Sequence, residues 1–195
     1  MTLTQRRASK RKIEILEAAL AVLSEDGYSR ASMDKIAERA LLTRVGLYKH
    51  FRDKHSLIAA LRQYKLLELT EQVRAALQAA PDFENKLRTV VQETLFYQSQ
   101  NQGFFRVLLS SSFSSDLSAD DSLKPFIYVV AEVFALGLES GLLHPADPLE
   151  YAGLLTTLVF EPSIKQAFIT LPKDFAPPSH LGELISRVFL QGVLI

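Results

Sequence analysis

The chain has 195 residues, of which 48% are apolar and 23% charged, as is usual for a globular protein. It contains no cysteine, which excludes disulfide bonds, thiolate metal sites, iron–sulfur clusters and cysteine nucleophiles. The best candidate for a membrane span, residues 126–138, is shorter than the ~20 residues required and contains Glu132. The start of the chain does not match the pattern of a signal peptide either, so we expect a soluble, cytoplasmic protein with no membrane contact.

The net charge is zero, yet it is unevenly distributed. Residues 1–54 carry 12 basic and 7 acidic side chains, a net of +5, and the remainder carries −5. Chance variation of the surface could produce such a split, but five basic residues precede the first acid, Glu14, and suit contact with phosphates: Arg6, Arg7, Lys10, Arg11 and Lys12. Eleven of the twelve phenylalanines follow residue 80. The sequence thus predicts a small basic module followed by a larger body rich in aromatic rings.

Nearly every segment has helical periodicity, and none alternates convincingly with a period of two. The first helix has its apolar face at Ile13, Leu16, Leu20 and Leu23, and we expect Gly27 to end it. Ser32 is a good N-cap for a second helix over 33–40, and Thr43 for a very short third helix through residue 51. After Asp53 a long fourth helix should run up to Pro81.

Five more helices are expected over 83–100, 103–112, 122–141, 148–171 and 179–194. Turn-rich stretches at 110–121, 144–148 and 172–178 separate them, and Pro162 should kink the helix that contains it. The sequence therefore predicts an all-α fold of about nine helices, divided into a helix-turn-helix domain over 1–54 and a helical ligand-binding and dimerisation domain over 55–195.

Residues 32–51 fit two short helices joined by a tight turn. Ala37 is small where the helices must approach closely, and Leu42 and Leu47 are apolar where the second helix must pack on the first. This pattern is typical of a helix-turn-helix, whose second helix can enter a DNA major groove ~12 Å wide.

The flanking residues make this part of the chain resemble the N-terminal domain of tetracycline-repressor-like (TetR) transcriptional regulators. The matching positions are I-L-E-A-A at 15–19, Gly27-Tyr28, Ser32-Met33, Ile36-Ala37, Ala40, Thr43, L-Y-x-H-F at 47–51, Lys54 and Leu57. The resemblance implies a repressor that binds a pseudo-palindromic operator as a homodimer and is released by a small molecule. The chain departs from the family at Leu41, where the turn usually has glycine, at Val45-Gly46 and at Lys49. If the turn requires a left-handed residue, Leu41 is strained or the turn is remodelled.

Each candidate DNA contact also has an ordinary structural explanation. At the start of the third helix, Arg44 could bind guanine or remain solvated, and Val45 could touch a thymine methyl group or solvent. Gly46 could let the backbone approach DNA. The resemblance implies a phosphate contact for Tyr48, which could instead pack between helices. The remaining candidates for phosphate contact are Ser32 and Thr43, which are caps first, together with Lys49, His50 and Lys54. For Lys49 a base is as good a partner as a phosphate, and His50 could instead support local packing.

The larger region is expected to hold an apolar or aromatic ligand, although core packing would explain each ring singly. Candidate ligand residues are Glu93, Phe96, Tyr97, Phe104, Phe105, Tyr128, Glu132 and Phe160, with Gln98 and His144 as further polar groups. The last two helices carry more apolar residues than one small domain needs, which favours a four-helix dimer interface over burial within one chain: Leu154, Leu155, Leu158, Val159, Leu184, Ile185, Val188 and Phe189.

Little in the sequence favours an enzyme. The four histidines lack metal-binding spacing, the eight glycines form no phosphate loop, and there is no nucleophile elbow. We expect no catalytic residue, metal or cofactor. Two alternatives stay open: a DNA-binding regulator controlled by a protein partner or by nothing, and a helical small-molecule carrier or enzyme.

Overall fold

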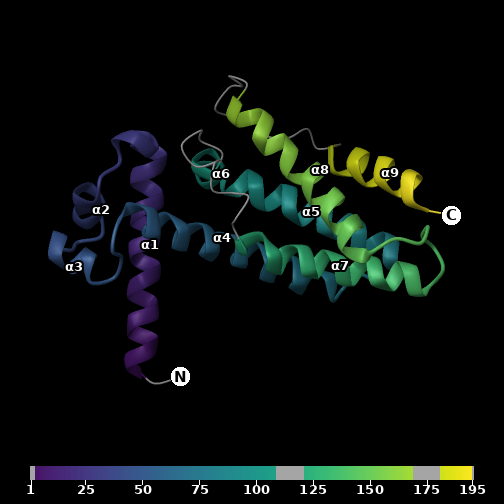
Figure 1. Ribbon diagram of the computed structural model, residues 1–195, viewed down its shortest axis with the longest axis horizontal. Helices are drawn as coiled ribbons and strands as arrows, with labels where there is room; N and C mark the ends of the chain where they lie inside the picture. Colours follow the sequence, from purple (N-terminus) through teal and green to yellow (C-terminus); the bar gives the residue numbers. More distant parts are fainter. Residues whose placement is uncertain (1–2, 109–120, 169–180, 195) are drawn as a thin grey trace. The chain divides into compact units, whose positions relative to one another are not determined.

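The computed structural model describes the backbone of residues 3–108, 121–168 and 181–194, and the side chains of residues 9–107, 121–160 and 182–194. These residues form α-helices and one short 3-10 helix, with no strand among them (Figure 1). The elements are α1 (Leu3–Arg30), α2 (Met33–Arg39), α3 (Arg44–Tyr48), α4 (Lys54–Leu77), α5 (Phe83–Gln100), α6 (Gln102–Leu108), η2 (Asp121–Leu123), α7 (Lys124–Glu139), α8 (Pro148–Phe168) and α9 (Leu181–Val193). The predicted all-α class is confirmed.

The described residues divide into two compact units. The N-terminal unit consists of residues 3–65 and 103–108, and the C-terminal unit of residues 66–102, 121–168 and 181–194. The division falls inside α4, between Lys65 and Leu66. The predicted domain boundary after residue 54 remains a prediction.

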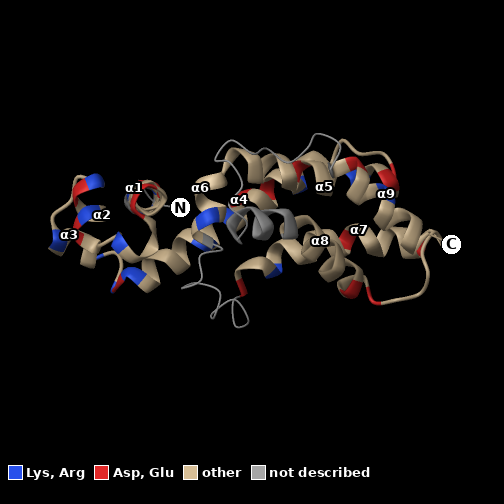
Figure 2. Cartoon of the chain, turned by 90° about the horizontal axis from the view of Figure 1, so that it is seen from above, with Lys and Arg blue, Asp and Glu red and all other residues tan. Residues whose placement is uncertain are grey.

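In the N-terminal unit, α2 packs against α1 and α3 packs against α2. Ile15, Ile36, Leu47 and Leu57 are fully buried in its core. On the face predicted for α1, Leu16 and Leu23 are buried and Leu20 is partly buried, but Ile13 is exposed, and Ile15 takes its place in the core. The small side chain of Ala37 is also buried and permits the close packing of the short helices. Figures 1 and 2 show α2 and α3 on the same side of α1.

The short helices α2 and α3 begin at the predicted N-caps. The Oγ of Ser32 accepts from the backbone N–H of Lys35 at 3.3 Å, and the Oγ1 of Thr43 accepts from that of Gly46 at 3.1 Å. Gly27 has φ 76° and breaks the regular path of α1, as expected, but a further helical turn follows it and extends α1 to Arg30. Three helices end at least two residues earlier than predicted: α3 at Tyr48, α4 at Leu77 and α7 at Glu139.

The C-terminal unit is organised around Phe134, which is fully buried on α7. Its ring stacks on Tyr151 of α8 at 5.2 Å and also contacts Phe83 of α5 and Phe189 of α9, at 5.9 and 5.6 Å between centroids. One residue on each of four helices thus meets in a single aromatic cluster. Gly137, one turn after Phe134, permits this packing because a Cβ there would lie 2.8 Å from the Phe83 ring.

Several predictions concern residues beyond those described. The proline-rich connection at 172–178 and most of the stretch at 110–121 lie outside them, as do the predicted ends of the helices at residues 112, 171 and 179. The helix α8 continues past position 162 to Phe168, and the kink expected at Pro162 stays a prediction. None of the helices described is long and apolar enough to cross a membrane.

Candidate nucleic-acid interface

The turn between α2 and α3 has the hydrogen bonds of a Schellman motif. The N–H of Leu42 donates to the carbonyl of Ala37 at 2.8 Å, and that of Leu41 donates to the carbonyl of Glu38 at 3.0 Å. Leu41 has φ 53°, which among the described residues makes it the one non-glycine residue with a left-handed backbone. The turn is therefore not remodelled, and it forces a leucine into a conformation that suits glycine.

Arg11 of α1 holds this turn from outside. Its Nη2 donates to the carbonyl of Ala40 at 3.0 Å and to that of Leu41 at 3.4 Å, while its Nη1 pairs with Glu14 at 2.8 Å. The sequence placed Arg11 among the phosphate contacts of a basic arm. The guanidinium is engaged by groups of its own domain in the structure, and a phosphate contact of Arg11 stays a prediction.

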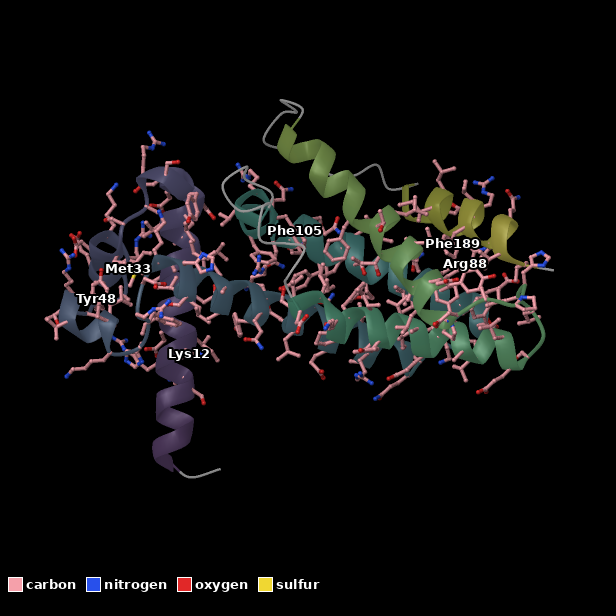
Figure 3. All side chains as sticks on the ribbon, in the orientation of Figure 1. Lys12, Met33, Tyr48, Arg88, Phe105 and Phe189 are labelled. Carbon is pink, nitrogen blue, oxygen red and sulfur yellow. The ribbon has the colours of Figure 1, made fainter. Side chains whose placement is uncertain are left out.

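The short helix α3 buries Leu47 completely and exposes most of its other side chains. Val45 is 69% exposed and Tyr48 40%, and Arg44, Lys49 and His50 are exposed as well. Figure 3 shows Tyr48 on α3 and Met33 on α2. Lys49 forms no ion pair with any described side chain. The candidate contacts 44, 45, 48, 49 and 50 therefore form one accessible surface.

Gly46 has another role than the one expected. A Cβ at this position would lie 3.2 Å from the Oγ1 of Thr43 and 3.4 Å from the Cδ2 of Leu42. The missing side chain thus leaves space for the N-cap of α3 and for the turn before it. Close approach of the Gly46 backbone to DNA stays a prediction.

Arg44 is fixed on two sides in the structure. Its Nη1 lies 3.0 Å from the Oδ2 of Asp34 on α2, and its guanidinium carbon lies 5.7 Å from the centroid of the Tyr48 ring. Nothing in the sequence singles out Asp34 as a partner. The two residues are ten positions apart on different helices, so the turn between α2 and α3 brings them together.

Lys54, at the start of α4, has partners within its own unit. Its ammonium donates to the carbonyls of Tyr28 and Ala31, the latter at 2.7 Å, and lies 4.2 Å from the centroid of the Tyr28 ring. Burial of the ammonium lowers the pKa of Lys54. The lysine thus holds the end of α1 to the start of α4. Its contact with a phosphate stays a prediction.

One lysine and one arginine of α2 are also paired with acidic residues of α1. Lys35 lies 2.6 Å from Asp26, and Arg39 pairs with Glu25. Figure 2 accordingly shows basic and acidic residues together on this part of the unit. On α1, Lys10 and Lys12 are exposed, and the ammonium of Lys12 lies 5.7 Å from the ring of the buried Phe51. The side chains of Arg6 and Arg7 lie outside those described.

The candidate ligand residues are distributed over both units. Phe104 and Phe105, which are buried and pack edge to face at 5.1 Å, belong to the N-terminal unit. The others lie in the C-terminal unit, where Phe96 and Tyr128 are 57% and 54% exposed. Two surface hollows, of about 500 and 320 Å³, are lined by other residues: Val22, Glu25, Asp26, Lys35, Glu38, Arg39 and Leu41, and Asp82, Phe83, Glu84, Asn85, Arg88 and Leu142.

Several candidate polar groups of the C-terminal unit already have partners. The buried Tyr97 donates its hydroxyl to Glu68 at 2.7 Å, and Glu93 accepts from the Nε2 of Gln72 at 2.8 Å. Glu132 is exposed and lies 3.5 Å from Arg74. The Nε2 of Gln98 donates to the carbonyl of Val159 at 3.2 Å. Phe160 packs edge to face on Phe126, with 5.7 Å between the ring centroids, and His144 is exposed. Their role towards a ligand stays a prediction.

The apolar residues of α8 and α9 separate into two sets. Leu155, Val159 and Phe189 are buried in the unit and Ile185 is partly buried. The others stay exposed in the single chain: Leu154 61%, Leu158 44%, Leu184 45% and Val188 59%. Each helix thus presents an exposed apolar pair spaced by four residues, beyond what the unit itself buries.

Metal binding finds no support in the described part of the chain. No group of three or more histidine, aspartate or glutamate side chains there could hold a metal ion.

Comparison with known proteins assigns the N-terminal unit. The model of "Bacterial regulatory proteins, tetR family" matches residues 15–61. The chain is 32% identical over 108 residues to the HTH-type transcriptional activator FasR of Mycolicibacterium smegmatis, a match that covers 55% of this chain and 49% of FasR. It is 21% identical over 133 residues to the fatty acid metabolism regulator protein of Bacillus subtilis, covering 66% and 69%. The match thus spans about half the length of FasR.

Solved structures extend the likeness to the whole fold. The fatty acid degradation regulator FadR of Bacillus halodurans superposes with a TM-score of 0.81 at 21% identity, over 92% of this chain and 94% of that one. FadR of Bacillus subtilis in complex with stearoyl-CoA superposes with a TM-score of 0.74 at 17% identity, over 92% and 95%. The helix-turn-helix predicted at residues 32–51 and the larger helical region are confirmed, and these relatives are regulators rather than enzymes.

Proposed function

Because this chain belongs to the tetR family of bacterial regulatory proteins, we propose that it is a DNA-binding transcription regulator whose α3 enters the major groove. The observation that carries the proposal is the accessible surface of α3, held by a Schellman turn next to a buried core. A helix of five residues can offer few base contacts, so its first turn must supply them. Arg44 and Val45 occupy that turn.

The side chains of α3 suit different parts of a DNA site. The guanidinium of Arg44 can donate two hydrogen bonds to the O6 and N7 of guanine, and Val45 can pack on a thymine methyl group. Lys49, His50 and the hydroxyl of Tyr48 suit phosphates, which position the protein without selecting a sequence. Ser32 and Thr43 already cap helices, and their hydroxyls can at most add phosphate contacts.

The second part of the proposal is a homodimer. The exposed apolar pairs of α8 and α9 would be covered by the same pairs of a second copy, which buries four helices about a two-fold axis. Two copies of α3 would then meet half-sites about one helical turn apart, or a multiple of it, on a pseudo-palindromic operator.

The third part concerns regulation by a small molecule. A relative of the same fold is described in complex with stearoyl-CoA, and another regulates fatty acid metabolism by name. We therefore take a ligand with a long apolar chain, such as a fatty acyl thioester, as the first candidate for this protein. Ligand release of a repressor is the mode we favour, although FasR is named an activator. Control by a protein partner is the second candidate.

A titration with DNA tests these parts separately. Fragments from the neighbourhood of the gene would be titrated with the full-length protein by fluorescence anisotropy, with and without stearoyl-CoA. We expect saturable binding to one fragment and weaker binding when the ligand is present. Binding that the ligand leaves unchanged would reject ligand release but keep the DNA-binding regulator, whereas failure to prefer any fragment, even in a randomised library, would reject the regulator.

A further inference from the structure

Arg44, although exposed, has two partners in the structure, Asp34 and Tyr48. Both partners of the Arg44–Asp34 pair are largely exposed, 64% and 59% of their side chains, so the pair contributes little to the stability of the fold. Nevertheless it links the first residue of α3 to the first turn of α2 across the turn. The Tyr48 ring adds a second constraint on the guanidinium.

The bond to Asp34 leaves part of the guanidinium available. A guanidinium has five N–H donors in one plane, and Asp34 engages one Nη1 donor. Neither the Nε nor the Nη2 of Arg44 donates to any described residue. These two nitrogens form one edge with two parallel donors, which is the arrangement that binds the O6 and N7 of guanine.

We propose that Asp34 is a specificity-determining residue that acts by positioning Arg44, fixing one edge of its guanidinium so that the other edge is presented to a base. The proposal rests on the proposed function, since it takes Arg44 as a base contact. An arginine held in one orientation loses less rotational freedom on binding than a free one. It also binds well only where a base offers two acceptors in the matching place, so the pair favours guanine over the other bases.

The charge of Asp34 has an opposite, non-specific effect that a test must separate. A carboxylate beside the proposed base contact repels phosphates, so its neutralisation strengthens binding to every sequence. Affinity alone would therefore mislead. The informative quantity is the ratio of affinities for guanine and for the other bases at the position that Arg44 contacts.

The experiment measures this ratio in a library in which the operator is randomised one position at a time. The proteins are the wild type, Asp34→Asn, Asp34→Ala, Arg44→Ala and the double variant Asp34→Ala with Arg44→Ala. Glu38→Gln is the matched control, because Glu38 is an exposed acid of the same helix that pairs with no described side chain. Circular dichroism confirms that each variant is folded.

We expect Arg44→Ala to abolish the guanine preference at one position per half-site, and Asp34→Asn and Asp34→Ala to lower it by about two- to fivefold at that same position. In the double variant the Asp34 change should have no further effect there. Glu38→Gln should alter affinity for all sequences alike and leave the ratio unchanged.

Three results would overturn the proposal. A guanine preference that rises in Asp34→Asn would show that Asp34 withholds Arg44 from DNA, and a ratio that changes no more than in Glu38→Gln would show a general charge effect. If Arg44→Ala alters no single position, Arg44 is not a base contact and Asp34 has nothing to position. By contrast, a wild type that lacks any sequence preference contradicts the proposed function itself.

Discussion

Leu41 combines a left-handed backbone with a side chain that packs on almost nothing. Its φ is 53° and it is 89% exposed, so the leucine gains little from burial in return for the strain of the turn. The strain is tolerated because two backbone hydrogen bonds and the guanidinium of Arg11 hold the turn.

Leu41→Gly should therefore stabilise the protein. Glycine removes a left-handed strain of roughly 1–2 kcal/mol but adds about 0.5–1 kcal/mol of unfolded-state entropy. We expect a rise of about 0.5–1 kcal/mol in the free energy of unfolding, measured by urea denaturation. Leu41→Ala is the control, since alanine keeps the Cβ and should give no rise; a gain equal to that of glycine would show that the exposed side chain, rather than the backbone, was unfavourable.

We expect Lys54 to contribute to the stability of the fold and Lys49 to DNA affinity. Lys54→Met keeps the apolar stem but leaves the carbonyls of Tyr28 and Ala31 without their donor, which we expect to lower the free energy of unfolding by about 1–3 kcal/mol. Lys49→Met should leave stability unchanged, weaken binding to all DNA sequences and reduce the slope of log affinity against log salt by about one. Thermal unfolding and salt titrations of both variants would show the difference, and identical behaviour would contradict it.

Asp53 begins α4 with a reciprocal cap. Its Oδ1 accepts from the N–H of Ser56 at 2.7 Å, and the Oγ of Ser56 accepts from the N–H of Asp53 at 3.2 Å. The bond from the Ser56 backbone, followed by that from Arg52, lowers the pKa of Asp53 to about 2 from 3.8.

This cap predicts a dependence of stability on acid. A carboxyl with a lowered pKa in the folded state stabilises the fold above its unfolded pKa and loses that effect as the pH falls towards 2. The side chain of Asp53→Asn is uncharged at every pH, whereas that of the wild type becomes protonated as the pH falls. The wild type should therefore melt at a higher temperature than the variant at pH 4, and this difference should shrink towards pH 2. A difference that stays constant over this range would contradict the role of the charged cap.

The elements that the sequence predicted best are those with local signals. Ser32 and Thr43 mark the starts of α2 and α3 through their own hydroxyls. The resembled family usually has glycine where this chain has Leu41, and this difference indicated the left-handed backbone of that residue. The bonds of Arg11 and Lys54 to backbone carbonyls and the pair of Asp34 with Arg44 were not predicted, because these partners lie 10 to 30 residues apart and follow no periodicity. The sequence assigned Arg11 to phosphates by its charge and Lys54 by its charge and its place at a helix start, and neither signal indicates the carbonyls that the two side chains hold in the fold.

For the molecule as a whole, the exposed apolar pairs of α8 (Leu154 and Leu158) and α9 (Leu184 and Val188) predict a homodimer. Leu154→Glu places a charge in the proposed interface, so we expect a shift from dimer to monomer in sedimentation velocity at micromolar concentration. Leu142→Glu is the matched control, because Leu142 is also exposed, 43%, but lies outside both helices. A wild-type monomer, or equal dissociation by both variants, would contradict an interface built from α8 and α9.

The helix α4 runs without interruption through the division between the two units. We therefore expect a ligand of the C-terminal unit to affect DNA affinity through α4. Thermodynamic reciprocity then requires DNA to weaken ligand binding by the same factor, typically ~5- to 150-fold. Calorimetric titration of stearoyl-CoA into the protein with and without its DNA would measure the factor, and an affinity for stearoyl-CoA that DNA leaves unchanged would contradict the coupling.

The central claim, that a dimer contacts DNA through two copies of α3, is tested most directly by footprinting the full-length protein on a site selected from random DNA. We predict two protected half-sites related by dyad symmetry, about one helical turn apart or a multiple of it. Arg44→Ala should lose the preference for the same base in each half-site. A footprint without dyad symmetry, or the failure of any sequence to be enriched, would contradict the account.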